Sequence, residues 1–99
     1  MTEAELRKSA IALAQLLGYR VYFTWSSIHS PGGFPDIIAV REKPDRTAEM
    51  VALELKSERG KLTQAQKEWL ALLAKVPGIR VGCFKPSEWE AIVEILKRA

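Results

Sequence analysis

The sequence predicts one α/β domain over residues 1–99, in which a small mixed β-sheet is flanked by helices in the order α-β-β-β-α-β-α. Three stretches carry apolar residues at helical spacing, and each follows a residue pattern typical of a helix N-terminus. Four short runs between them are rich in β-branched and aromatic residues, which is typical of strands. A chain of 99 residues has the size of one small domain, so any functional site must share its single core.

The N-terminal quarter of the chain predicts a helix followed by a strand. Thr2 and Glu5 form a capping-box pattern, which marks the start of the helix. Apolar residues then recur at helical spacing until Gly18, a natural stop. Residues 19–25 are aromatic and β-branched, which predicts the first strand. The serines, proline and glycines of residues 26–33 predict a loop.

The centre of the chain predicts two buried strands joined by a turn. Residues 36–41 and 50–56 are mostly apolar runs, and the polar residues 42–49 between them contain a proline and an aspartate. Strands that follow each other so closely usually pair antiparallel. We therefore expect the beginning of the first strand to lie beside the end of the second.

The remaining residues predict a helix, a strand and a last helix. Thr63 and Gln66 repeat the capping-box pattern at the start of the second helix. Residues 79–84 predict the fourth strand. Ser87 and Glu90 give a third capping-box pattern, from which we expect the last helix to begin.

Composition and charge exclude several classes of protein. Apolar residues make up 47% of the chain and charged residues 27%, which argues against disorder. A single cysteine excludes an internal disulfide and a cysteine-based zinc site. No apolar run reaches the roughly 18 residues that span a bilayer, and the first residues lack the apolar stretch of a signal peptide. We therefore expect a protein of the reducing cytoplasm with no membrane partner.

The net charge of +3 permits an anionic partner without requiring one. Residues 1–49 carry six basic and six acidic side chains, whereas residues 50–99 carry nine basic and six acidic ones. The whole positive excess therefore lies in the second half of the chain. A solvated surface of mixed charge would give the same numbers, so charge alone leaves nucleic-acid binding open.

The third predicted strand places a glutamate and a lysine on one face. Side chains alternate along a strand, so Glu54 and Lys56 point the same way, roughly 7 Å apart. The intervening residue, Leu55, belongs to the opposite, continuously apolar face. One interpretation is an exposed ion pair on a surface strand, which contributes little. The other is that both side chains belong to a site.

Asp36 favours a site. It opens an apolar strand directly after Pro35, where an aspartate has no packing role, although an Asx turn before the strand is an alternative. Antiparallel pairing of the central strands would bring Asp36 to Glu54 and Lys56. Two close carboxylates repel each other unless a cation lies between them or one is protonated. Carboxylate oxygens suit Mg²⁺ or Mn²⁺, and a nearby lysine can orient water or offset negative charge.

These residues carry a resemblance. Pro35-Asp36, followed eighteen residues after the aspartate by Glu54-Leu55-Lys56, resembles the signature of the PD-(D/E)XK nucleases. Gly33, the Gly60-Lys61-Leu62-Thr63 segment, Gln66 and Trp69 make the chain similar to the VRR-NUC branch, the virus-type replication-repair nucleases. The similarity extends from Glu3 to about Cys83. It implies a restriction-endonuclease-like fold.

The resemblance also implies roles for the central residues. Asp36 and Glu54 match the metal-binding carboxylates of the family, and the backbone carbonyl of Leu55 would complete that side of the metal. Lys56 matches the catalytic lysine. The implied cofactor is Mg²⁺ or Mn²⁺, with no small-molecule cofactor.

Two further residues match the family with an alternative attached to each. Gln66 matches a glutamine beside the active site, but it is also the last residue of a capping box and could serve only the helix. Glu3 matches a glutamate that approaches the metal directly or through water, and Glu5 competes with it for that role. Arg7 stands where the branch often has glutamine, so a polar network on the first helix is in doubt.

The resemblance implies a metal-dependent DNA endonuclease of replication or repair, encoded by a bacterium or a phage. Stand-alone members of the branch imply a homodimer that acts on branched DNA such as Holliday junctions, because two-fold symmetry matches that substrate. The alternative is a non-catalytic nucleic-acid-binding module on the same fold. His29, in the loop before Asp36, is a further candidate for contact with a phosphate, although an exposed loop histidine explains it as well.

Overall fold

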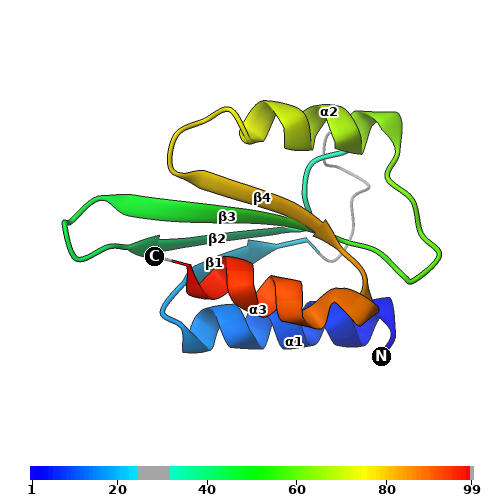
Figure 1. The fold of residues 1–99 in the computed structure, drawn as a ribbon, viewed down its shortest axis with the longest axis horizontal. Coiled ribbons are helices and arrows are strands. Elements are labelled where there is room, and N and C mark those ends of the chain that lie inside the picture. Colours follow the sequence, from blue (N-terminus) through cyan, green and yellow to red (C-terminus); the bar gives the residue numbers. More distant parts are fainter. Residues whose placement is uncertain (25–31, 99) are drawn as a thin grey trace.

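A computed structural model describes residues 1–24 and 32–98 (Figure 1). Its elements follow the predicted order: α1 (Glu3–Leu16), β1 (Arg20–Phe23), β2 (Ile37–Glu42), β3 (Ala48–Leu55), α2 (Gln64–Leu73), β4 (Ile79–Phe84), a 3₁₀ turn η1 (Pro86–Glu88) and α3 (Trp89–Lys97). Trp25 and His29 lie outside the described residues, as do the serines of the predicted loop. The predicted α/β fold class is confirmed.

The four strands form one sheet in sequence order. β2 and β3 pair antiparallel, as predicted; β1 also pairs antiparallel with β2, whereas β3 and β4 pair parallel. A parallel pair needs a crossover connection, and α2 provides it. The register of the central pair places Ile37 opposite Leu53, so the beginning of β2 lies beside the end of β3.

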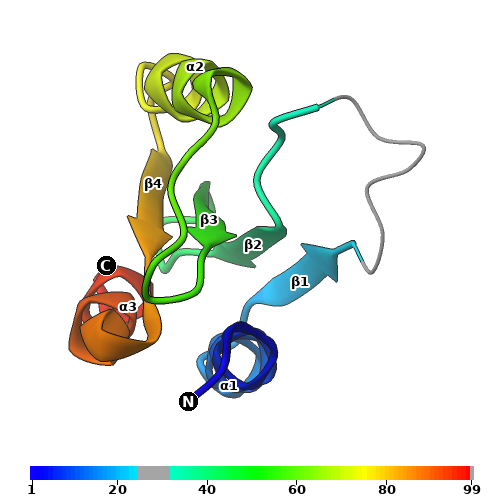
Figure 2. The ribbon, with the colours of Figure 1, turned by 90° about the vertical axis from the view of Figure 1, so that its right-hand side faces the viewer.

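Helices cover the two faces of this sheet unequally. α1 and α3 lie side by side against one face, and α2 lies on the other face over β4 (Figures 1 and 2). Inward side chains of α1 and α3 pack on the apolar residues of β2 and β3 to form the core. Its largest fully buried members are Leu6, Ile37, Leu53, Leu55, Ile92, Leu96 and Val51.

The third predicted capping box is wrong. α3 begins at Trp89, and its N-cap residue Glu88 forms no side-chain cap. Instead, Glu88 accepts a hydrogen bond from the backbone N–H of Lys85 and closes η1. Ser87 is instead engaged with the loop after β3, because both its N–H and its hydroxyl donate to the carboxylate of Glu58. A tertiary contact therefore replaced the local one.

A buried polar cluster closes the end of the sheet remote from Asp36. Glu49 lies on β3, only 4% exposed, and accepts from Arg80 at 2.7 Å and from Arg41 at 3.2 Å. The guanidinium carbon of Arg41 lies over the Tyr19 ring, 4.2 Å from the centre of the ring. The two arginines also donate to carbonyl groups at the C-terminal ends of α1 and α3, which are those of Leu17, Ile95 and Arg98. These bonds tie both helices to the sheet.

None of the helices in residues 1–24 and 32–98 has the length and apolar character that crossing a bilayer requires.

Candidate active site

The structure brings Asp36 and Glu54 together where β2 begins and β3 ends. Asp36 lies one residue before β2, and its Oδ2 accepts a hydrogen bond of 3.1 Å from the backbone N–H of Leu55. The pairing of Ile37 with Leu53 then places Asp36 beside Glu54. The carboxyl groups are close enough to hydrogen-bond when one is protonated. The predicted convergence of the two carboxylates is confirmed as geometry.

Glu54 is buried, with only 2% of the residue exposed, so the interpretation as a surface ion pair is wrong. Its Oε2 accepts from Gln66 at 3.3 Å and lies 3.8 Å from the Lys56 ammonium. Its other oxygen, Oε1, is buried without a hydrogen-bond partner among the described residues. Burial, followed by the hydrogen bond and the negative charge of Asp36, raises the pKa of Glu54 to about 8.

Lys56 follows directly after β3 and is held by the loop behind it. Its backbone N–H donates to the carbonyl of Phe84, which extends the β3–β4 pairing by one residue. A side chain at Gly60 would lie 3.2 Å from the Lys56 Cβ, so the turn passes close to the lysine stem. The bonds between Glu58 and Ser87 fasten this loop to η1. The lysine side chain is only 17% exposed and is thereby directed to Glu54.

Gln66 makes contacts that agree with both of the interpretations that the sequence left open. Its Oε1 accepts from the N–H of Thr63 at 2.9 Å and completes the predicted capping box of α2. Its Nε2 donates to Glu54 across 3.3 Å. The amide is the residue type that allows this, because one end accepts while the other donates. The start of α2 is therefore fixed to the carboxylate pair.

The segment before Asp36 packs closely on α2. Gly33 has φ +90°, and a Cβ at this position would lie 2.6 Å from the backbone of Ala65. Only glycine accommodates both the left-handed backbone and this approach. Next to it, the rings of Phe34 and Trp69 meet edge to face at 5.0 Å. These contacts position Asp36 relative to Gln66.

The first helix contributes a residue that the sequence did not assign to the site. The Arg7 guanidinium lies 3.4 Å from Asp36 and 3.9 Å from Glu3, with the same nitrogen facing both. Sequence comparison presented Arg7 only as a departure from the family pattern. Its spacing of one helical turn after Glu3 was the available signal. Glu3 and Asp36 are thus bridged by a cation of the chain itself.

The carboxylates fit a hard divalent cation, although they are few. Within residues 1–24 and 32–98, no three His, Cys, Asp or Glu side chains are grouped as a metal site. Asp36 and Glu54 nevertheless present carboxyl oxygens side by side, and Oε1 of Glu54 is buried without a partner among the described residues. A cation would satisfy that oxygen and relieve the repulsion between the carboxylates. The roles of Glu3 and of the Leu55 carbonyl as metal ligands stay predictions.

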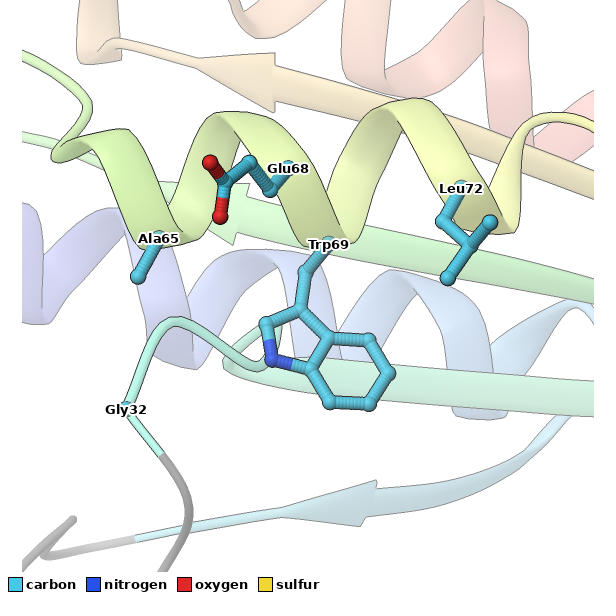
Figure 3. Close-up of a pocket in the computed structure, with 5 residues that line it drawn as sticks. All are labelled: Gly32, Ala65, Glu68, Trp69 and Leu72. Carbon is cyan, nitrogen blue, oxygen red and sulfur yellow. The ribbon is translucent and has the colours of Figure 1, made fainter.

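A pocket of about 300 Å³ lies between α2 and the segment before β2 (Figure 3). Ala65, Trp69 and Leu72 project into it from the helix, and Gly32 faces them from the segment before β2. The carboxylate pair and Lys56 are not part of its lining. Trp69 is half-buried between this pocket and Phe34.

Known proteins resemble the chain in sequence and in fold. A family model described as the VRR-NUC domain matches residues 3–86, which extend from α1 to the start of η1. A solved structure described as a "VRR_NUC domain protein" is 17% identical, with a TM-score of 0.66. The similarity covers 98% of this chain and 88% of that one. A comparison with curated proteins gives no match.

Proposed function

Because this chain belongs to the VRR-NUC domain family, a family of the nuclease type, we propose that it is a metal-dependent DNA endonuclease that hydrolyses phosphodiester bonds. The observation that supports this most is the environment of Glu54. A carboxyl group only 2% exposed, beside a second carboxylate and with one oxygen unpartnered among the described residues, is costly to ionise unless a cation binds it, and otherwise it keeps a proton.

In this proposal Asp36, Glu54 and the carbonyl of Leu55 hold Mg²⁺ or Mn²⁺, with Glu3 approaching directly or through water. The bound ion supplies Lewis acidity and a water of lowered pKa. Gln66 keeps one oxygen of Glu54 engaged and so orients the other. Lys56 positions the attacking water and offsets negative charge that develops on the phosphate.

We propose branched DNA, such as a four-way junction, as the substrate and a homodimer as the active assembly. Both follow from the family resemblance, and a two-fold dimer suits a two-fold substrate. Exposed basic residues beside the site are available for backbone phosphates, namely Arg59, Lys61 and Lys67.

The test is cleavage of linear and four-way-junction DNA in Mg²⁺, in Mn²⁺ and in chelator, with the wild type, Asp36→Asn and Glu54→Gln. Asparagine keeps an oxygen that can accept from the Leu55 N–H, so we expect both variants to fold and neither to cleave. Glu42→Gln, which removes an exposed carboxylate at the remote end of β2, is the matched control. Cleavage by Asp36→Asn or Glu54→Gln at the wild-type rate would contradict the ligand assignment.

Binding of junction DNA without cleavage under every metal condition would favour the non-catalytic module instead. Light scattering tests the assembly, because a dimer has twice the 11.1 kDa mass of the chain. A strict monomer that still makes paired incisions would rule out the symmetric dimer.

A further inference from the structure

Arg7 is a cationic side chain that lies beside Asp36, one of the proposed metal ligands. Its terminal nitrogen lies 3.4 Å from Oδ2, the same oxygen that accepts from the Leu55 N–H. The side chain is 23% exposed. Its Nε is buried and has no hydrogen-bond partner among the described residues. The guanidinium therefore forms an ion pair with Asp36 through a terminal nitrogen and leaves its buried Nε–H unsatisfied.

The charges of the site show what Arg7 adds. Three carboxylates, those of Glu3, Asp36 and Glu54, face two cations, Arg7 and Lys56. With all groups ionised, the cluster has one net negative charge, and a divalent cation makes it net positive by one. Without Arg7 the metal-loaded cluster would be neutral. The arginine therefore decides whether the loaded site attracts an anion.

We propose that Arg7 is the resident counter-ion of Asp36, which competes with the divalent cation for this carboxylate and, once metal is bound, donates to a non-bridging oxygen of the phosphodiester. The second half of this statement rests on the proposed nuclease function. The first half concerns the protein and the metal alone.

The chemistry of the guanidinium supports the exchange of partners. Arginine presents its Nε and terminal nitrogen as a planar fork, which fits two oxygens of one phosphate. In the structure only the terminal nitrogen faces a carboxylate, and the unsatisfied buried Nε–H costs free energy. A phosphate oxygen would satisfy it once metal binding to Asp36 lets the guanidinium turn away from that carboxylate. Glutamine or lysine at this position could not supply both prongs and the charge.

Isothermal titration with Ca²⁺, an oxygen-seeking cation, tests the competition without any turnover. Arg7→Gln removes the charge and should tighten Ca²⁺ binding about tenfold, because repulsion between the arginine and the metal is lost. Arg7→Lys keeps the charge and should bind Ca²⁺ within about threefold of the wild type. The matched control is Arg46→Gln, which breaks an exposed Arg–Glu pair at the remote β2–β3 turn and should leave the affinity unchanged. Circular dichroism verifies that each variant is folded.

Cleavage and salt-dependent DNA binding test the phosphate contact. Arg7→Gln should lower the cleavage rate by on the order of 10²-fold despite its tighter metal binding. In Ca²⁺, the slope of log affinity for DNA against log salt should fall by about one for Arg7→Gln but not for Arg46→Gln.

The outcomes separate the two proposals. Tighter Ca²⁺ binding by Arg7→Gln, with no cleavage by the wild type on any DNA, supports the counter-ion and overturns the nuclease. Unchanged or weaker Ca²⁺ binding by Arg7→Gln, with active wild type, overturns the counter-ion and leaves the nuclease. Absence of Ca²⁺ binding by the wild type and by Arg7→Gln at millimolar concentration overturns the counter-ion, and cleavage by the wild type in Mg²⁺ or Mn²⁺ decides the nuclease separately.

Discussion

Glu49 and Glu54 lie on the same strand, are almost equally buried, and have pKa values shifted in opposite directions. Burial raises the pKa of each. At Glu49, hydrogen bonds from Arg80 and Arg41 outweigh burial and hold the pKa below its usual value. At Glu54, the neighbouring Asp36 adds to burial and raises the pKa to about 8. The first glutamate is a structural anion, whereas the second is poised to exchange a proton for a cation.

The raised pKa of Glu54 predicts how stability varies with pH without metal. The folded protein keeps a proton on this group up to about pH 8, whereas the unfolded chain releases it near its ordinary value of 4.5. Since the folded state binds more protons, the free energy of unfolding should fall as pH rises between these values. Glu49, with its lowered pKa, acts in the opposite sense and only below that range.

Thermal unfolding in chelator from pH 5 to pH 9 measures this effect. We expect the melting temperature of the wild type to fall across the range, and that of Glu54→Gln to change much less. Millimolar Ca²⁺ should flatten the wild-type curve, because the cation binds the ionised carboxylate of the folded state. A wild-type melting temperature that is constant or rises from pH 5 to pH 8 would show that Glu54 is ionised throughout.

Lys56 separates chemistry from binding. Lys56→Met keeps most of the stem beside Gly60 and removes the ammonium that lies 3.8 Å from Glu54. We expect the cleavage rate to fall on the order of 10²–10³-fold, as for loss of one preorganised electrostatic donor. DNA affinity in Ca²⁺ should fall much less, because one phosphate contact is a small part of the total. Lys75→Met, at an exposed position after α2, is the matched control. Equal losses of binding and cleavage would make Lys56 a phosphate anchor.

The two functions of Gln66 can be separated by substitution. Gln66→Glu keeps an oxygen for the Thr63 N–H, so the capping box survives, but it loses the donor to Glu54. We expect stability to be retained when Glu54 is protonated, near pH 6, and cleavage to be reduced. Thr63→Ala removes the other half of the cap and should cost about 1 kcal/mol of stability with little change in activity per folded molecule. Measuring both cleavage activity and stability to chemical denaturation distinguishes the capping contact from the contact with Glu54. A fully active Gln66→Glu variant would show that Gln66 serves only the helix cap.

Gly33 is predicted to be indispensable for the position of Asp36. Gly33→Ala forces a Cβ to within 2.6 Å of the Ala65 backbone at a φ of +90°. Gly18→Ala has a similar φ of +93° but no atom within 4 Å, and should cost only about 1 kcal/mol. Gly32→Ala meets no atom within 4 Å and has no left-handed backbone, so it should leave stability and activity unchanged. We expect Gly33→Ala alone to lose cleavage activity; equal activity in all three variants would show that this contact does not position the site.

Local patterns predicted most of the fold and half of the site. Alternation in β3 and the short connection to β2 were enough to place Asp36 beside Glu54, because both rules act over a few residues. The burial of Glu54 and the arrival of Arg7 depend on how α2 and α1 pack on the sheet. The arginine partners of Glu49 lie on β2 and β4, and one of them, Arg80, is 31 residues away along the chain. Sequence periodicity carries no record of such contacts.

Once Glu54 is ionised, the β2–β3 hairpin combines an attractive end with a repulsive one. At its turn, Lys43 and Thr47 are joined by a backbone hydrogen bond of 2.7 Å, and Arg41 is paired with Glu49 on the neighbouring strand. At its open end, two carboxylates face each other. The hydrogen bonds between β2 and β3 should therefore form first at the turn and last at the site, and local opening should begin at the site. The end of the hairpin that holds Asp36 and Glu54 would be the last part to pair during folding. A cation bound there would stabilise the strand pairing where it is weakest.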